Sequence, residues 1–394
     1  MQYNRNLILI TFAQVFSFTA APVTIFLSGI IGSQLTSIKV LSTLPTSMMI
    51  VGTALFTIFA SKIMSHIGRQ KGFILACILT SLSALIAAYA IYIDSFYLYC
   101  ITCFTIGNGL AFTHQYRFAA AESVDKDMIP RAISIIMLAG ILSAIIGPNV
   151  AIFSKDIIEG YTFVGSYLAL SVLTTIPIFA LFFFKQAAPN QKKVIVPGRS
   201  YRELLKVPRF TQSIVVAAMA YAIMSFLMTA TPISMHTIDG HSVAATGYVI
   251  QSHIVAMFLP SLLTGKLIKR FGHSSVIYAG VLFLFLTMLM SLFEHTYINY
   301  LISLISLGLG WNFLFITSTS LLVVSYKEHE RFKAQGFNDI MVFSMQATAS
   351  LSAGFVLSLL GWQIMNIICI PFLFLVIYMT YSADQYEKRQ IVDN

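Results

Sequence analysis

The sequence predicts an all-α membrane protein with twelve transmembrane helices in two pseudo-symmetric six-helix bundles. Three observations support this prediction. The chain of 394 residues is 57% hydrophobic and only 10% charged, which is more apolar side chain than an aqueous core would bury. Apolar runs of about 20 residues, the length that crosses a hydrocarbon layer as a helix, recur along it. One long polar interval, 185–210, separates these runs into two sets.

The apolar runs define the predicted spans in chain order. In the first half they lie near residues 7–31, 38–60, 71–92, 95–117, 131–153 and 162–184, and in the second half near 211–235, 243–265, 274–293, 298–324, 336–358 and 362–382. Helices are expected rather than a barrel, because barrel strands alternate polar and apolar residues. We therefore expect bundles at 1–184 and 211–382, a basic cytoplasmic linker at 185–210 and a cytoplasmic tail at 383–394.

Lys and Arg are concentrated in alternate loops. With both termini in the cytoplasm, the outer loops keep only Lys39 and Lys155. Because membrane insertion retains basic residues on the cytoplasmic side, this distribution predicts that orientation. Topology thus accounts for the net charge of +9, and no nucleic-acid partner is expected. The four cysteines all lie in apolar segments without metal-ligand spacing, so we expect neither a metal nor a cofactor.

The two halves carry similar loops after their second spans. The stretch SKIMSHIGR from Ser61 has the same spacing as GKLIKRFGH from Gly265, and an internal repeat of this kind is typical of transporters built from two parallel halves. These loops resemble the Gly-x-x-x-Asp-Arg-x-Gly-Arg loop of the major facilitator superfamily. The matching residues are Gly68, Arg69, Gly265, Arg270 and Gly272.

Further stretches carry the same resemblance. Gly147 and Pro148 resemble the Gly-Pro motif of superfamily antiporters, although Ser143 replaces a glycine. Cys103 stands where drug and proton antiporters have an arginine. The stretches HQYRFAAAE from 114, HIVAMFLPSLLTG from 253 and ERFKAQGFNDIMVF from 330 look like motifs of a bacterial subgroup whose substrates are mostly unassigned. The resemblance covers essentially the whole chain and implies the fold of this superfamily.

The resemblance also implies that the first, fourth, seventh and tenth spans line a central cavity. Polar residues that share a helix face on these spans, with one tryptophan beside them, are candidates for substrate contact. They are Gln14, Ser17, Asn108, Gln115, Trp311, Asn312 and Thr319. The alternative for each is helix packing, since small residues and amides also join neighbouring helices in membranes.

Ionisable residues within spans are the candidates for coupling and gating, because a charge in hydrocarbon is costly. Asp339 is the candidate to take up and release a proton near Arg117 or Arg331, with a structural ion pair or helix cap as the alternative. His253 is a second candidate, since the unperturbed pKa of histidine, about 6.5, suits proton exchange. It could instead bond a neighbouring helix. Gln346 shares a face with Asp339, and Glu122 is interpreted as a loop or gate residue.

The predicted function is secondary active transport of a small organic solute across a bacterial inner membrane by alternating access, coupled to protons or another ion. The sequence has no Gly-x-x-x-x-Gly-Lys-Ser/Thr loop and no catalytic cluster, so no enzymatic activity is expected. The scarcity of deep charges favours an amphiphilic metabolite, a siderophore or a drug-like compound, and a monomer is expected. The alternatives are a facilitative uniporter, or a non-transporting sensor or lipid scramblase on the same scaffold.

Overall fold

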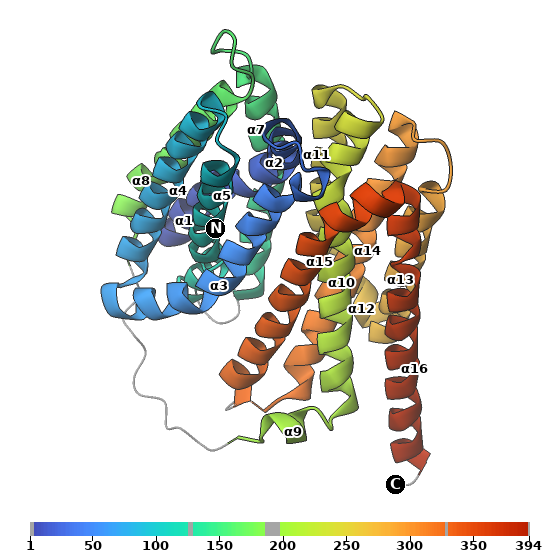
Figure 1. The fold of residues 1–394 in the computed structure, drawn as a ribbon. Coiled ribbons are helices and arrows are strands. Elements are labelled where there is room, and N and C mark those ends of the chain that lie inside the picture. Colours follow the sequence, from blue (N-terminus) through green and yellow to red (C-terminus); the bar gives the residue numbers. More distant parts are fainter. Residues whose placement is uncertain (1–3, 125–128, 186–197, 328–329, 393–394) are drawn as a thin grey trace.

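The protein consists of two helical bundles side by side. The computed structural model describes residues 4–124, 129–185, 198–327 and 330–392, and these ranges contain helices and no strands. Figure 1 shows the first bundle in blue to green and the second in yellow-green to red, with the short helix α9 (Tyr201–Leu204) beneath the second. The predicted all-α fold is confirmed.

The first bundle has six helical crossings, two of them interrupted. Its elements are α1 (Arg5–Ser17), α2 (Ala20–Leu35), η1 (Lys39–Leu41), α3 (Leu44–Ile67), α4 (Arg69–Tyr92), α5 (Phe96–Thr113), α6 (Tyr116–Glu122), α7 (Ile129–Ser154) and α8 (Val164–Phe182). Helices α1 and α2 together form the first crossing, and α5 and α6 the fourth. Pro22 has no N–H to donate to the carbonyl of Phe18 four residues earlier, so the helical ladder is interrupted at the first of these breaks.

The second bundle repeats the plan, and prolines mark where its helices begin and end. Its elements are α10 (Pro208–Pro232), η3 (Ile233–Ile238), α11 (Val243–Phe258), α12 (Ser261–Phe271), α13 (His273–Met290), α14 (Tyr297–Ser325), α15 (Arg331–Ile367) and α16 (Ile370–Val392). Pro208 opens α10, and Pro232 ends it where the π-helical turn η3 follows. Pro260 separates α11 from α12, which are bent by 42° relative to each other.

The number of crossings agrees with the twelve predicted spans. Ten helical runs in the described ranges are long and apolar enough to cross a membrane, and the bent pair of α11 and α12 makes an eleventh. The run Lys333–Gln390 has 58 residues, which at about 1.5 Å per residue far exceeds one crossing of about 30 Å. Gly361, at φ 74°, breaks this run, and Figure 1 shows α15 and α16 on opposite courses. It therefore counts as two crossings.

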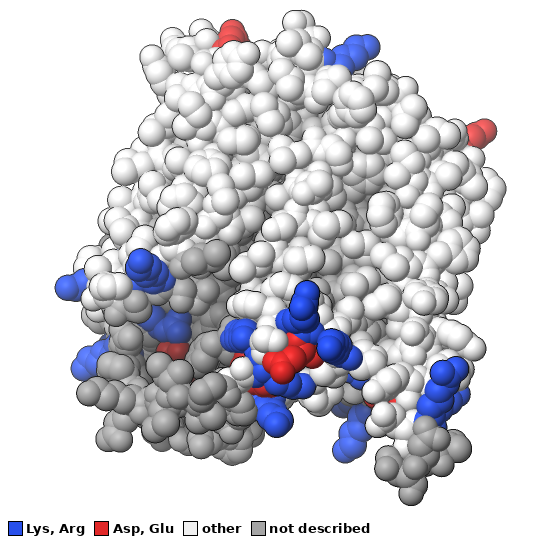
Figure 2. Space-filling view, turned by 60° about the horizontal axis from the view of Figure 1, so that its bottom comes forward, with Lys and Arg blue, Asp and Glu red and all other residues white. Residues whose placement is uncertain are grey.

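The two ends of the molecule differ in charge. Lys and Arg gather at the end that Figure 2 turns toward the reader, which we call the basic end, and the opposite end is called the far end. Both ends of the chain lie at the basic end, since Asn6 bonds to the Lys185 carbonyl at the end of α8 (2.7 Å) and Arg209, at the start of α10, pairs with Glu387 (2.6 Å).

The repeated loops have the same backbone in both halves. Gly68 joins α3 to α4 at φ 85°, and Gly272 joins α12 to α13 at φ 81°. These left-handed values favour glycine, which explains its presence at equivalent places of the two copies. Arg69 follows the first of them and pairs with Glu122 at the end of α6 (2.6 Å). Arg270 instead lies over the Phe271 ring (5.2 Å).

The two bundles touch each other near the far end. Ser47 on α3 lies 2.9 Å from Ser350 on α15, hydroxyl to hydroxyl, and Asn149 on α7 donates to Gln251 on α11 (3.3 Å). At Gly354 a Cβ would lie 2.2 Å from the Thr43 hydroxyl, so only glycine allows this approach of α15 to the first bundle. Toward the basic end the bundles diverge (Figure 1). The space between them is therefore closed at the far end.

Candidate functional site

A large cavity lies between the two bundles. Its empty volume is about 1320 Å³, including solvent at its mouth, and both bundles line it. From the first bundle come side chains of α1, α2, α3, α5, α6 and α7, and from the second those of α10, α11, α14 and α15. A concave site of this kind, between helices of two bundles, is typical of small-molecule binding.

One side of the cavity is an aromatic wall from the second bundle, formed by Tyr221, Phe258, Trp311, Phe315 and Phe343. Trp311 and Phe315, one turn apart on α14, are stacked with ring centroids 4.9 Å apart and planes 21° apart. Tyr221 on α10 lies edge-on to both rings, at 5.1 and 4.9 Å. Such a wall presents flat apolar faces and ring edges, which suit a planar aromatic solute.

Polar groups interrupt the wall. His253 on α11 is buried, and its Nδ1 lies 2.8 Å from the Leu304 carbonyl. Because a carbonyl only accepts, Nδ1 carries the hydrogen and Nε2 of the neutral ring is an acceptor. This Nε2 and the indole Nε1 of Trp311 have no hydrogen-bond partner among the described residues. Gln14 on α1 and Gln346 on α15 add amides from the two bundles.

Two ionisable side chains of opposite type, Arg117 and Asp339, come from different bundles. Arg117 on α6 lines the cavity, and the charge of Arg117 acts on Asp339 on α15. The guanidinium carbon of Arg117 lies 4.7 Å from the centre of the Phe118 ring, and its Nε has no hydrogen-bond partner in the described part of the chain. Asp339 accepts a hydrogen bond from the neighbouring Asn338 amide at 3.3 Å. The two side chains are thus within electrostatic range of each other but form no salt bridge.

The structure brings five of the predicted site residues to the cavity. They are Gln14, Arg117, His253, Trp311 and Gln346. Two came from the predicted substrate-contact set and three from the coupling and gating set. Asp339 lies beside Arg117 but is not part of the lining. The Arg331 side chain lies outside the described residues.

Three predicted cavity residues instead join helices. Ser17 contacts the Tyr116 hydroxyl (3.1 Å), and the amide nitrogen of Asn108, oriented to donate, reaches the carbonyls of Phe104 and Gly52 at 3.1 and 3.2 Å. Asn312 accepts from the Thr264 hydroxyl (2.6 Å) and donates to the Met257 carbonyl (2.6 Å). All three are buried away from the cavity, because their polar groups are used by neighbouring helices.

Gln115 and Thr319 also lie away from the lining. Gln115 is the residue before α6, in the turn that ends α5, and Thr319 is exposed with its hydroxyl bonded to the Phe315 carbonyl (2.7 Å). The side of the fourth crossing that meets the cavity carries Leu110, Thr113, His114 and Arg117, which is a different face from that of Asn108 and Gln115. On α14 the cavity side is that of Trp311 and Phe315, next to the predicted stripe.

Sequence reasoning missed most of the aromatic wall and a polar stripe on α10. Tyr221, Ser225 and Thr229 are spaced four apart and all line the cavity. The helical-phase argument that selected Gln14 would have found this stripe in the seventh span. Phe315 and Phe343 carry no such signal, since phenylalanine is common on every face of a membrane helix.

The Gly-Pro motif of the fifth span lies against the break in the first. A Cβ on Gly147 would lie 3.1 Å from a Val23 methyl and 3.3 Å from the Pro22 ring. Four residues earlier, Ser143 donates to the Val15 carbonyl (2.7 Å). These contacts fix α7 to the α1–α2 break beside the cavity. Gly265 has open space around it.

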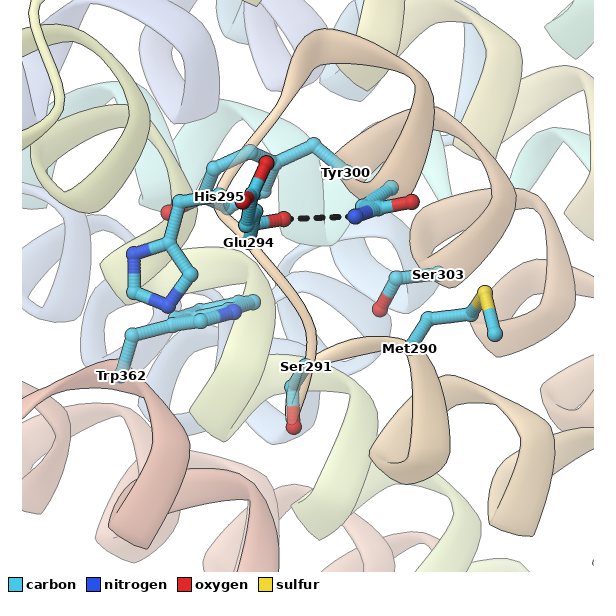
Figure 3. A pocket seen from close by; sticks show the side chains of 8 residues that line it. Met290, Ser291, Glu294, His295, Tyr300, Ser303 and Trp362 are labelled. Carbon is cyan, nitrogen blue, oxygen red and sulfur yellow. Dashed lines mark hydrogen bonds between the residues drawn. The ribbon is translucent and has the colours of Figure 1, made fainter.

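A second, smaller pocket lies in the second bundle at the far end (Figure 3). It is lined by Met290, Ser291, Glu294, His295, Asn299, Tyr300, Ser303 and Trp362. Next to it, Asp239 accepts a hydrogen bond from the Tyr300 hydroxyl (2.6 Å) and lies 3.0 Å from His295 Nδ1. The Tyr300 hydroxyl also contacts Ser234 of η3 (2.7 Å). This network holds η3, which packs against α2 of the first bundle.

Residues 7–349 match the family model of the Major Facilitator Superfamily. The chain belongs to the major facilitator superfamily. Its fold agrees with solved superfamily transporters. A bacterial homologue of the human lysosomal transporter Spinster, crystallised inward-facing and unoccupied, matches with a TM-score of 0.70 at 12% identity over 98% of both chains. The human organic anion transporter MFSD10 matches at 0.69 and 13% identity, over 95% of this chain and 99% of that one.

Superfamily relatives of higher identity are transporters too. The chain is 37% identical to the riboflavin transporter RfnT of Brucella anthropi over 377 residues, which cover 95% of this chain and 94% of that protein. It is 25% identical to the uncharacterised MFS-type transporter YddS of Bacillus subtilis, over 93% of this chain and 87% of that one. The chain is thus a superfamily transporter of the two-bundle fold.

Proposed function

We propose that this transporter moves riboflavin, or a solute with the same ring system, across the membrane. The observation that carries the proposal is the aromatic wall, in which the stacked Trp311 and Phe315 and the edge-on Tyr221 face a central cavity. A flat heteroaromatic ring fits such a wall through stacking and edge contacts. The 37% identity to a riboflavin transporter over nearly the whole chain supports the same solute.

The transport cycle we propose is alternating access. The bundles are closed at the far end through Ser47 and Ser350 and diverge toward the basic end, and the opposite tilt would expose the cavity to the far end. The excess of Lys and Arg makes the basic end the cytoplasmic side of a bacterial inner membrane, with both termini in the cytoplasm. Both bundles that line the cavity belong to one chain, so a monomer suffices.

Proton coupling is proposed at Asp339. The side chains of Asp339 and Arg117 come from different bundles, and we propose that attraction between a charged Asp339 and the Arg117 guanidinium favours closure of the basic end. Protonation of Asp339 removes that attraction and releases the bundles. Gln346, two turns along the same helix, lines the cavity, which supports a proton site near the solute. His253 is the second candidate for the proton site, and a uniporter would need neither to titrate.

A bacterial strain that cannot make riboflavin tests the solute. We expect expression of this chain to restore growth at low external riboflavin, Trp311→Ala to abolish the rescue, and Thr319→Val, on the same helix but outside the cavity, to retain it. Absence of rescue with the protein present in the membrane would refute the proposal.

A second experiment tests coupling. Riboflavin uptake by Asp339→Asn should lose its dependence on an imposed pH gradient, and retained proton-driven uptake would exclude the coupling role of Asp339.

A further inference from the structure

Two unpartnered nitrogens lie beside the aromatic wall. The side chains of His253 and Trp311 are 0% and 2% exposed, and both line the cavity. Within the described ranges, His253 Nε2 and Trp311 Nε1 find no hydrogen-bond partner. Buried polar groups without partners are rare because each is unfavourable, so two at one cavity indicate a ligand that completes them.

The two nitrogens have opposite hydrogen-bonding character. Since His253 Nδ1 donates to the Leu304 carbonyl at 2.8 Å, its Nε2 accepts. The Trp311 indole N–H only donates. A ligand that satisfies both must therefore present both an N–H and an acceptor oxygen or nitrogen.

Close helix packing holds the donor and the acceptor together. At Gly308, one turn before Trp311, a Cβ would lie 2.6 Å from the His253 carbonyl oxygen, so α14 and α11 are in direct contact at this level. Further along, the Asn312 amide donates to the Met257 carbonyl (2.6 Å) and the Ser261 hydroxyl (2.7 Å). These contacts fix the spacing of α11 and α14, the two helices that carry His253 and Trp311.

We propose that His253 and Trp311 recognise the edge of a planar heteroaromatic ring that carries an N–H beside a carbonyl. His253 Nε2 accepts the ring N–H, and the Trp311 indole N–H donates to the ring carbonyl. The inference rests on the proposed function and deepens it. The ring of riboflavin carries N3–H between two carbonyls at one edge, and its ribityl chain is attached away from that edge. Recognition thus falls on the ring edge rather than on the ribityl chain.

Ligand analogues test this edge recognition directly. Binding to the purified full chain is measured by the change in flavin fluorescence for riboflavin, 3-methylriboflavin and lumiflavin, which has a methyl group in place of ribityl. We expect riboflavin and lumiflavin to bind within about threefold of each other. Because 3-methylriboflavin cannot donate to His253, we expect it to bind at least about tenfold more weakly.

Matched variants assign the effect to the two nitrogens. His253→Asn can still donate to the Leu304 carbonyl but lacks the Nε2 acceptor. This variant should bind riboflavin about tenfold more weakly and bind 3-methylriboflavin with unchanged affinity, so that it no longer discriminates between the two ligands. Trp311→Phe keeps an aromatic ring without the N–H and should weaken both ligands. The control Thr319→Val, outside the cavity lining, should bind as the wild type does.

The outcomes separate this inference from the proposed function. Equal binding of riboflavin and 3-methylriboflavin by the wild type, or full discrimination in His253→Asn, would overturn the inference and leave riboflavin as the solute. Failure of the wild type to bind either riboflavin or lumiflavin would overturn both. If His253→Asn does not fold, the comparison of ligands on the wild type decides.

Discussion

The far end and the basic end of the molecule use polar contacts in opposite ways. At the far end, hydrogen bonds between neutral side chains connect the two bundles, as in the Ser47–Ser350 and Ser33–Thr237 pairs at 2.9 and 3.3 Å. At the basic end, ion pairs lie within one bundle. Arg69 pairs with Glu122 inside the first (2.6 Å), and Arg209 pairs with Glu387 inside the second (2.6 Å).

This difference indicates which contacts set the conformation. In the described part of the chain no salt bridge joins the two bundles, so the bundles part at the basic end without breaking one. The contacts between bundles are close packing and single hydrogen bonds at the far end, each worth about 1 kcal/mol. Contacts of this strength can be exchanged in a transport cycle, and the ion pairs named above each stay within one bundle.

The largest effect is expected from breaking the far-end contact at Gly354. In Gly354→Ala the added Cβ would lie 2.2 Å from the Thr43 hydroxyl and 2.6 Å from the Val40 carbonyl. The Val40 carbonyl belongs to the backbone and cannot rotate away. We therefore expect the substitution to destabilise this contact by an amount in the upper part of the roughly 1–3 kcal/mol that is typical of overpacking. The far end should open, and a cysteine introduced at Ser225 in the cavity should react more slowly with an impermeant reagent added at the basic end.

Gly336→Ala is the matched control for this substitution. Gly336 lies on the same helix, and a Cβ there meets nothing within 4 Å. The cysteine of Ser225→Cys should react at the same rate in the Gly336→Ala background as in the protein without a glycine substitution. Equal reactivity in the Gly354→Ala background as well would show that the far-end contact does not hold the conformation.

A second effect concerns the buried acid of the basic end. Glu330 accepts from the Arg199 backbone and side chain at 2.8, 2.8 and 2.7 Å, and its side chain is 0% exposed. Glu330→Gln should lower the free energy of unfolding by about 2 kcal/mol, the usual size for hydrogen bonds to a charged group. Because the pair lies in the second bundle and the segment before α9, the accessibility of the cavity should stay unchanged.

The pH dependence of this pair has a defined sign. The hydrogen bonds from Arg199 hold the pKa of Glu330 below its ordinary value of 4.5. A lowered pKa contributes stability that is fully present above about pH 4.5 and is lost as the pH falls through the folded-state value. Thermal unfolding of wild type and Glu330→Gln should therefore differ most near pH 7 and converge in acid. A constant difference across this range would contradict the assignment.

A smaller effect is expected at the serine pair of the far end. Ser47→Ala and Ser350→Ala each remove a buried hydroxyl contact between the bundles, which should shift the conformational ratio by about 1 kcal/mol, or some fivefold. In the double variant the shifts should be less than additive, because both substitutions remove the hydroxyl–hydroxyl contact. Fully additive shifts would mean that the hydroxyls act only through their other partners, the Ser350 carbonyl for Ser47 (2.8 Å) and the Thr229 hydroxyl for Ser350 (2.8 Å).

The smallest effect is expected at Glu122. This side chain is 50% exposed in its pair with Arg69, and exposed pairs contribute about 0–1 kcal/mol. Glu122→Gln should leave the reactivity of the Ser225→Cys probe within about twofold of the background. A larger change would assign Glu122 to the gate between the bundles, as its sequence position had suggested.

The fold was predictable because hydropathy and the distribution of Lys and Arg are properties of whole segments. They can be read from the sequence without knowing which face of a helix each residue occupies. Site residues depend on which face of each helix meets the cavity. On the fourth crossing that face carries Leu110, Thr113, His114 and Arg117, whereas Asn108 lies against Gly52. Helix packing also uses the residue types that line cavities, as the buried amide of Asn312 shows, so polarity in a span cannot separate the two roles.

The most direct test of the account is a pair of distance measurements on the same protein, with and without riboflavin. One pair of probes at Lys71 and Lys269, both exposed, reports the basic end, and another at Glu159 and Ile298, also exposed, reports the far end. With saturating riboflavin, a fraction of the molecules should show a shorter distance between the probes at Lys71 and Lys269. The same fraction should show a longer distance between the probes at Glu159 and Ile298. Distances that do not respond to riboflavin at either end would contradict transport of this solute by alternating access.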